Sequence, residues 1–342
     1  MAERHKVGII GCGDYVSRWD APVIKRSKLI EVKSLFDLDS SRAKKLAKVV
    51  GGGVVDCADA IFSDDQIDIV CLFVPPFVRK DVLVRAAKAG KHIITTKPLA
   101  PNVKDCIAMV KEVRNADVKC GVFYRRTGNA VFETYKKIFE SGEVGKLALY
   151  KQDWIHHYPQ WNDWATDREK NGGPFMDAMI HNMNIARYLM GRKPTRCTYF
   201  SDNHAHTLKC NDTEFMKLDF ESNSSAHLFI TWAADLQVFS KEGNDREHID
   251  ITYMVTDKGW RLTDGQADGK TVITASREGK KRTWVVENLP ATPYDEFAES
   301  VEKDTPLASD IPDIVEAAED IKLMRDAEGK VGQRAAVNLT LK

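Results

Sequence analysis

Residues 7–13 read Val-Gly-Ile-Ile-Gly-Cys-Gly, an apolar run that leads into a glycine turn, and this stretch decides the fold of the first half of the chain. A helix is predicted to begin at residues 14–16, and a second apolar run, residues 29–36, ends at Asp37. This order is typical of a dinucleotide site, because the turn lets the backbone approach a pyrophosphate and the acid accepts hydrogen bonds from a ribose. The alternative is an ordinary strand–turn–helix in which glycine only serves the turn.

Two details depart from the usual dinucleotide motif. Val16 takes the place of its third glycine, and the interval from Gly11 to Asp37 exceeds the usual spacing of about 20 residues. We attribute the extra length to Pro22, which is expected to interrupt the helix and add a second short piece. Cys12, inside the turn, is either a small space-filling residue or a redox-sensitive thiol.

Length and composition narrow the class of protein. The chain has 342 residues, which suits two domains, and its 50 basic residues balance 50 acidic ones, which argues against nucleic acid or an anionic membrane as partner. No apolar stretch approaches the ~20 residues that span a bilayer, and the first residues lack a secretory pattern. Seven scattered cysteines without a C-x-x-C pair indicate a reducing compartment, so we expect a cytoplasmic protein.

The pattern of predicted helices and strands changes part-way along the chain. Up to about residue 120, strands alternate with helices, which predicts a Rossmann domain, residues 1–124, with a doubly wound parallel sheet. Later runs such as residues 249–256 alternate with a period of two, which predicts an α+β domain, residues 125–342, with an open, mainly antiparallel sheet. Helices from about residue 293 are expected to pack back near the first domain. The cleft between the domains is the expected active site.

Lys97 is the first candidate for chemistry. It follows a predicted strand at the carboxyl edge of the parallel sheet, where open α/β sheets bind ligands, and it precedes Pro98. Oxidation of an alcohol needs a group that handles the hydroxyl proton, and a desolvated lysine can do so. The alternative is an ordinary solvated lysine in a loop.

Asp177 and His181 are the second candidate. They lie four residues apart in a predicted helix, and so on one face of it, after the turn Gly172-Gly173-Pro174. A histidine accepts a proton near neutral pH, and an aspartate orients it or holds a substrate hydroxyl. The alternative is an acid that favours the helix N-terminus and a histidine that belongs to the core.

An aromatic and polar stretch, residues 154–164, is suited to contact with a sugar ring, although such residues also fill cores and interfaces. No grouping of histidine, cysteine and acidic residues has the spacing of a metal site, so no metal is predicted. The candidate substrate-binding residues are Tyr124, Arg126, Trp154, His156, Trp161, Trp164, Asp177 and His181.

Several of these segments together resemble the glucose–fructose oxidoreductase / inositol dehydrogenase / MocA (Gfo/Idh/MocA) family over nearly the whole chain. Residues 89–99, Ala-Gly-Lys-His-Ile-Ile-Thr-Thr-Lys-Pro-Leu, are similar to its A-G-K-H-V-x-x-E-K-P-L motif. Residues 172–181, Gly-Gly-Pro-Phe-Met-Asp-Ala-Met-Ile-His, resemble G-G-x-x-x-D-x-G-x-H. Residues 7–13 look like the family's cofactor turn, and residues 67–76 like its third-strand segment.

The resemblance implies a catalytic set of Lys97, Asp177 and His181, in which His181 accepts a proton and Lys97 holds or relays the proton of the reacting hydroxyl. It also implies a Rossmann domain followed by an open-sheet domain, a sugar or cyclitol substrate, and a homodimer or homotetramer formed through the C-terminal sheet. The chain departs from the family pattern at four positions. These are Arg79 for a histidine, Thr96 for a glutamate, Met179 for a glycine and Asn184 for an aspartate.

We predict NAD rather than NADP as the cofactor, because Asp37 should repel a 2′-phosphate and Leu38 offers it no positive partner. The expected cofactor-binding residues are Gly11, Gly13, Asp14, Tyr15, Val16, Asp37, Leu38, Arg42, Val74, Pro75, Pro76, Thr96 and Lys97.

The sequence thus favours an NAD-dependent oxidoreductase acting on a secondary hydroxyl or ketone of a sugar or cyclitol. One alternative is a redox-neutral glycosidase, lyase or epimerase that retains NAD and works through a transient keto intermediate. A second is a regulator that binds NAD or a sugar without catalysis.

Overall fold

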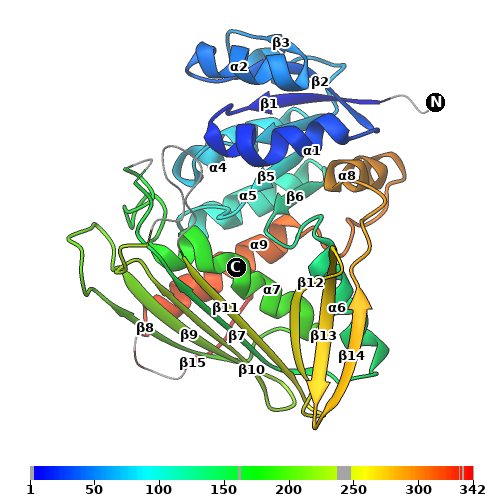
Figure 1. The fold of residues 1–342 in the computed structure, drawn as a ribbon. Helices are drawn as coiled ribbons and strands as arrows, with labels where there is room; N and C mark the ends of the chain where they lie inside the picture. The colour runs from blue at the N-terminus through cyan, green and yellow to red at the C-terminus, as the bar shows by residue number, and fades with distance from the viewer. Residues whose placement is uncertain (1–3, 161–162, 237–247, 331, 333–334, 342) are drawn as a thin grey trace. The chain divides into compact units, whose positions relative to one another are not determined.

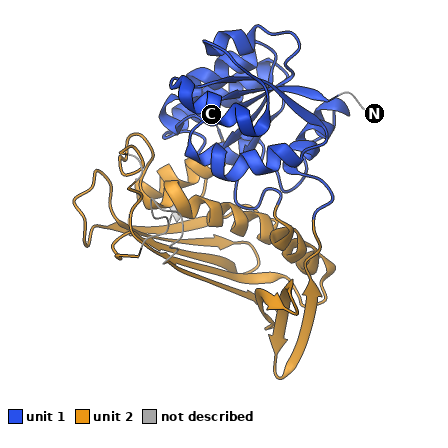
Figure 2. Cartoon of the chain, turned by 45° about the horizontal axis from the view of Figure 1, so that its top comes forward, with its two compact units in different colours: residues 1–128, 289–318, 341–342 blue, residues 129–288, 319–340 orange. Residues whose placement is uncertain are grey.

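The computed structural model describes residues 4–160, 163–236, 248–330, 332 and 335–341. The chain divides into two compact units, which Figure 2 draws in different colours. Unit 1 consists of residues 1–128, 289–318 and 341–342, and unit 2 of residues 129–288 and 319–340. Each unit is therefore assembled from separate stretches of the chain.

Unit 1 is built around a six-stranded sheet whose neighbouring strands are all parallel (Figure 1). The strand order β3-β2-β1-β4-β5-β6 is that of a Rossmann fold, which confirms the predicted fold. All residues of β4 and β6 are buried, as expected for strands covered on both faces. The strands are β1 (His5–Ile10), β2 (Ile30–Phe36), β3 (Gly53–Val54), β4 (Ile69–Leu72), β5 (His92–Thr96) and β6 (Cys120–Phe123).

The helix after the glycine turn differs from the prediction. A π-helical turn, η1 (Val16–Asp20), leads directly into α1 (Ala21–Arg26), and Pro22 lies in the first turn of α1. Residues 14–26 are helical throughout, so Pro22 does not interrupt the helix; the π turn directly before it accommodates a residue that has no N–H to donate.

The other helices of unit 1 follow the predicted alternation with strands. α4 begins at Pro76, because a proline suits the first position of a helix. Asn102 caps α5 by accepting a hydrogen bond from the Asp105 backbone N–H at 2.9 Å. The helices are α2 (Ser40–Val50), α3 (Ala58–Phe62), α4 (Pro76–Lys88), α5 (Val103–Asn115) and α8 (Pro293–Glu302).

Helix α8, late in the sequence, forms part of the core of unit 1. Tyr294 and Phe297 are fully buried in the same apolar cluster as the side chains of β1 and β2. The Asp295 carboxylate accepts hydrogen bonds from the Ser27 hydroxyl at 2.5 Å and from the Leu29 N–H at 2.9 Å. These bonds attach α8 to the segment that precedes β2.

Unit 2 is built around a nine-stranded sheet of order β14-β13-β12-β11-β7-β10-β9-β8-β15 (Figure 1). Its strand pairs are antiparallel except for β7 and β10, which confirms the predicted open, mainly antiparallel sheet. The strands are β7 (Leu147–Ile155), β8 (Arg196–Asp202), β9 (Thr213–Phe220), β10 (Ser224–Thr231), β11 (Ile249–Thr256), β12 (Arg261–Ala267), β13 (Lys270–Arg277), β14 (Lys280–Val285) and β15 (Ala335–Ala336).

The two faces of this sheet differ. Buried and partly exposed residues alternate strictly along β9 and β10, so one face is packed and the other is open. Helices α6 (Ala130–Ser141) and α7 (Ile180–Met190) pack on β7, β10 and β13 (Figure 1). A π-helical turn, η2 (Phe175–Met179), precedes α7, and α9 (Ile314–Glu328) begins in unit 1 and ends in unit 2. None of the helices in the described part of the chain is long and apolar enough to cross a membrane.

Candidate functional site

The glycine turn of unit 1 lies beside the ends of two strands. The Gly11 N–H donates to the carbonyl of Phe36, the last residue of β2, at 2.9 Å. Gly11 has a φ of +92°, and a Cβ there would lie 2.6 Å from the Phe73 carbonyl oxygen, so only glycine fits. A Cβ at Gly13, in contrast, would meet nothing within 4 Å. The turn thus combines a tightly packed first glycine with open space above the last one.

Asp37 reaches back to this turn. Its Oδ2 accepts a hydrogen bond from the Cys12 N–H at 2.6 Å, and its Oδ1 accepts one from the Asp39 N–H at 2.9 Å. Burial and the Asp37 charge raise the pKa of the Cys12 thiol to about 12, which argues against a reactive thiolate. Leu38 is 97% exposed, and Arg42 forms an exposed ion pair with Asp39. The acid and the turn fit the ribose and pyrophosphate of NAD, and no basic side chain in these contacts faces Asp37.

The helix that follows the turn packs by Val16, which is fully buried, while Asp14 and Tyr15 stay exposed. Asp20, at the end of η1, is buried and accepts a hydrogen bond from the Tyr294 hydroxyl. Burial raises the pKa of Asp20 to about 6, although the tyrosine hydroxyl bonds oppose this. The carboxylate is therefore a structural group in the wall behind the turn.

Lys97 stands directly after β5 and is partly buried. Its backbone N–H donates to the Phe123 carbonyl at 3.3 Å, and the Lys97–Pro98 peptide is cis. Thr96, just before it, is buried, and its carbonyl accepts a hydrogen bond from Arg79 at 2.7 Å. Two of the four departures from the family pattern, Thr96 and Arg79, are thus in direct contact. The residues Val74, Pro75 and Pro76 follow the neighbouring strand β4, with Val74 and Pro75 partly exposed.

Asp177 lies in η2 of unit 2, where the sequence predicted a regular helix. Its Oδ1 accepts a hydrogen bond from the Asn171 side-chain amide at 3.0 Å, and the same amide donates to the Ala165 carbonyl at 3.1 Å. Asn171 is fully buried just before Gly172 and Gly173, whose φ values are +111° and +90°. The sequence analysis missed Asn171; its place immediately before the two glycines was the available signal.

His156 is a buried histidine of unit 2. Its Nδ1–H donates to the His157 carbonyl at 2.7 Å, which leaves the lone pair on Nε2. Burial lowers the pKa of His156, while this hydrogen bond and the nearby Asp177 charge oppose the shift. Unit 2 therefore places a neutral imidazole near Asp177. His181 lies in the first turn of α7 and is partly buried.

The remaining predicted substrate residues lie in different settings. The Trp154 ring stands edge-on to the His156 ring at 6.0 Å, and Trp164 is partly buried. Tyr124 is buried in unit 1. Arg126 is 1% exposed and donates to the Ser309 carbonyl and to Glu316, at 2.7 and 2.8 Å, which favours a structural role. Trp161 lies outside the described residues.

The other two departures from the family pattern, Asn184 and Met179, lie in the core of unit 2. Asn184 is fully buried, and its amide donates to Asp320 Oδ2 at 2.8 Å. Asp320 also pairs with Arg187, so an amide at residue 184 avoids a second carboxylate beside Asp320. Met179 is fully buried within η2. Asn184 thus maintains the charge balance around Asp320, and Met179 contributes to the packing of the core.

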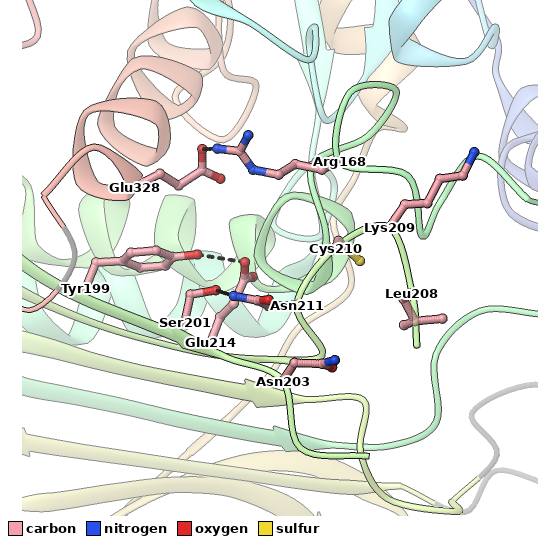
Figure 3. Close-up of a pocket in the computed structure, with 11 residues that line it drawn as sticks. Arg168, Tyr199, Ser201, Asn203, Leu208, Lys209, Cys210, Asn211, Glu214 and Glu328 are labelled. Carbon is pink, nitrogen blue, oxygen red and sulfur yellow. Dashed lines mark hydrogen bonds and ion pairs between the residues drawn. The ribbon is translucent and has the colours of Figure 1, made fainter. Parts of the chain in front are cut away.

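A cavity of about 380 Å³ opens in unit 2 between β8, β9 and the segment that precedes β9 (Figure 3). Two pairs of its lining residues are in contact: the Tyr199 hydroxyl donates to Glu214 at 2.7 Å, and Arg168 pairs with Glu328 at 3.0 Å. Glu214 also accepts from the Phe175 N–H at 2.5 Å, and burial raises its pKa to about 8. Its role is to hold the first residue of η2, the turn that carries Asp177.

Comparisons with known proteins agree with this geometry. Residues 5–124 match the model of the oxidoreductase family with an NAD-binding Rossmann fold, and residues 132–251 match the GFO/IDH/MocA C-terminal domain. The chain belongs to the Gfo/Idh/MocA family. Together with the geometry of the turn and Asp37, this membership makes unit 1 an NAD-binding domain, as predicted; the preference for NAD over NADP stays a prediction.

Individual members of the family share part of the sequence and the whole fold. The scyllo-inositol 2-dehydrogenase (NAD(+)) of Bacillus subtilis is 31% identical over 135 residues, 40% of this chain and 39% of that protein. The 2,7-anhydro-N-acetylneuraminate hydratase of Escherichia coli is 27% identical over 50% of this chain and 47% of that protein. The aldose-aldose oxidoreductase of Caulobacter crescentus superposes with a TM-score of 0.81 at 19% identity, over 98% of this chain and 100% of that chain. Among the curated relatives, the chain spans 39% to 61% of the length of each protein that it matches.

Proposed function

We propose that this protein is an NAD-dependent oxidoreductase that transfers a hydride between nicotinamide and a secondary hydroxyl, or the matching ketone, of a sugar or cyclitol. The observation that carries the proposal is the hydrogen bond from the Cys12 N–H to Asp37, since it fixes an acid beside the glycine turn as an adenosine ribose requires. The family membership and a relative named as an inositol dehydrogenase support the substrate class.

Oxidation in this proposal removes a hydride from the carbon and a proton from the hydroxyl oxygen. His181 accepts the proton, Lys97 holds or relays it, and Asp177 orients the substrate. When bound, NAD supplies the nicotinamide that takes the hydride with its two electrons. The aromatic Trp154 and the neutral imidazole of His156 are proposed to contact the substrate beside Asp177.

The test is a panel of inositols, aldoses and keto-sugars followed at the NADH absorbance, after the purified protein has been checked for bound cofactor. Lys97→Ala and His181→Ala should each lower kcat by about 10²-fold or more, the typical scale of general acid–base catalysis. Lys111→Ala, on an exposed face of α5, is the matched control and should leave kcat unchanged. Near wild-type turnover in both test variants would refute the assignment.

A redox-neutral reaction is the second candidate, because one relative is named a hydratase. In that case the enzyme oxidises a sugar transiently, lets a bond break or a centre invert, and returns the hydride from a retained cofactor. Turnover of a sugar without added NAD, with NAD copurifying, would favour this candidate over a net dehydrogenase.

The open face of the unit 2 sheet is the proposed contact between copies of the chain, as a homodimer or homotetramer. Ile249, Ile251 and Tyr253 project from alternate positions of β11 and are 39% to 44% exposed, an apolar row that a second copy would cover. Ile251→Lys should reduce the mass measured by light scattering. We also propose a cytoplasmic location, which the seven free cysteines support.

A further inference from the structure

Arg79 is a buried cation in an unusual setting. It lies in α4 and is 2% exposed, and its guanidinium donates to four backbone carbonyls. Nη1 bonds the carbonyls of Thr96 at 2.7 Å, of Pro98, and of Leu99 at 3.3 Å, and Nη2 bonds the Val74 carbonyl at 2.7 Å. Each of these partners in the described chain is a backbone oxygen.

The four carbonyls lie at or just after the carboxyl ends of β4 and β5. Three of them belong to the residues on either side of Lys97, and the fourth belongs to Val74, which follows β4. A guanidinium has five donors in a rigid planar fork, so one side chain can fix several carbonyls in a set geometry. Arg79 therefore connects the carboxyl end of β4 with the loop that presents Lys97.

Lys97 itself is anchored from the opposite side. Its N–H donates to Phe123, the last residue of β6. With that bond on one side and the guanidinium on the other, the backbone at Lys97 is held between α4 and β6. A fixed backbone limits the positions of the Lys97 ammonium to those that its side-chain rotamers allow.

We propose that Arg79 is a positioning residue for Lys97: its guanidinium fixes the backbone around the lysine and its distance from the end of β4. The proposal rests on the proposed catalytic role of Lys97.

The same sheet offers a matched control. Lys91 is 6% exposed at the other end of β5, and its ammonium donates to the carbonyls of Asp64 and Ile67 at 2.8 and 2.9 Å. It is also a buried cation bound only to carbonyls in these contacts, but it lies at the amino end of β5. Removing either cation leaves buried carbonyls without a donor, so both variants should lose stability.

The experiment compares Arg79→Met, Arg79→Lys and Lys91→Met in the full chain. Hydrogen exchange of the NAD-free protein should show the Lys97 amide exchanging about 10-fold faster in Arg79→Met, and unchanged in Lys91→Met. With myo-inositol and NAD as probes, kcat should fall about 10-fold or more in Arg79→Met, with KM values within about threefold. Arg79→Lys, which keeps the charge and some donors, should recover part of both losses.

Two results would overturn the proposal. One is wild-type exchange at Lys97 in Arg79→Met. The other is an equal loss of kcat in Lys91→Met and Arg79→Met at equal loss of thermal stability, since the effect would then be structural. If Arg79→Met does not fold, the same comparison is made with Arg79→Lys. A failure of the proposed function gives a different result. In that case Lys97→Ala keeps its turnover, while the Lys97 amide still exchanges faster in Arg79→Met.

Discussion

Each unit of this protein holds an aspartate next to a glycine turn, and the two are fixed by different means. In unit 1 the Asp37 carboxylate accepts a hydrogen bond from the backbone N–H of Cys12, inside the turn. In unit 2 the Asp177 carboxylate accepts one from the side-chain amide of Asn171, just before the turn. The first arrangement uses a group that every residue but proline carries, whereas the second depends on one particular side chain.

This difference predicts different consequences of mutation. Substitutions at Asp37 should change cofactor affinity and leave the chemical step, while substitutions around Asp177 should change the chemical step and leave cofactor affinity. Measuring both quantities in every variant tests the division of labour between the units.

The largest effect is expected for Asp177→Asn, which keeps the shape of the side chain and removes its charge. We expect kcat to fall by about 10²-fold, because the substrate and the proton acceptor lose an orienting carboxylate. The NADH dissociation constant, measured by fluorescence titration, should stay within about twofold of wild type. A weaker NADH affinity with a normal kcat would contradict the role of Asp177 in the chemical step.

Asp37→Asn should have the next largest effect. A hydrogen bond to a charged group contributes about 1.5–3 kcal/mol, so NADH affinity should fall by about 10-fold or more and the preference over NADPH should narrow. The kcat at saturating NAD should stay near wild type. Wild-type protein that binds NADPH at least as tightly as NADH would contradict the role given to Asp37.

Asn171→Leu removes the amide that holds Asp177 and keeps the volume of the side chain. A hydrogen bond to a charged carboxylate contributes about 1.5–3 kcal/mol, and because only part of it is expected to act on the chemical step, kcat should decrease by up to about 10-fold with unchanged NADH affinity. Asn211→Leu, at an exposed asparagine of the same unit, is the control and should keep full turnover. Equal kcat values for the two variants would show that Asn171 does not position Asp177.

The smallest effect on kcat at neutral pH is expected for Glu214→Gln, which should act on stability instead. Because burial raises the pKa of Glu214 in the folded protein to about 8, the folded state holds a proton that the unfolded state has lost above its ordinary pKa of 4.5. Stability from this group is full below that pH and is lost as pH rises toward 8. Urea unfolding gives the free energy of unfolding at each pH. Between pH 5 and 8 this free energy should decrease less steeply with pH in the variant than in the wild type, by up to about 1.4 kcal/mol per pH unit. An unchanged slope would contradict a buried neutral Glu214.

The sequence allowed the fold class to be predicted because its evidence is local. Apolar runs, glycine turns and two-residue alternation reflect the neighbours of each strand, and the two observed sheets confirm them. The position of Asp37 at the end of the second apolar run could also be predicted, but its hydrogen bond with the Cys12 N–H is known only from the structure. The roles of Arg79 and Asn171 could not be predicted, since their partners are carbonyls and a carboxylate that only the folded chain brings near.

The π turns were missed for a related reason. Residues 16–20 and 175–179 have no composition that separates a π turn from an α-helix, because the difference lies in one shifted hydrogen bond per turn. Asp177 and His181 still lie four residues apart across the join of η2 and α7, which is close to one turn in either kind of helix.

The interleaving of the units also bears on how the protein is made. A ribosome that has released residues 1–128 has produced every strand of the Rossmann sheet, but not Tyr294 and Phe297, which fill its core. Residues 129–288, with nearly all of the second sheet, must be translated before those two side chains emerge. Part of the apolar surface of the nascent N-terminal sheet therefore stays uncovered while nearly half of the chain is translated, and a chaperone could bind it at that stage.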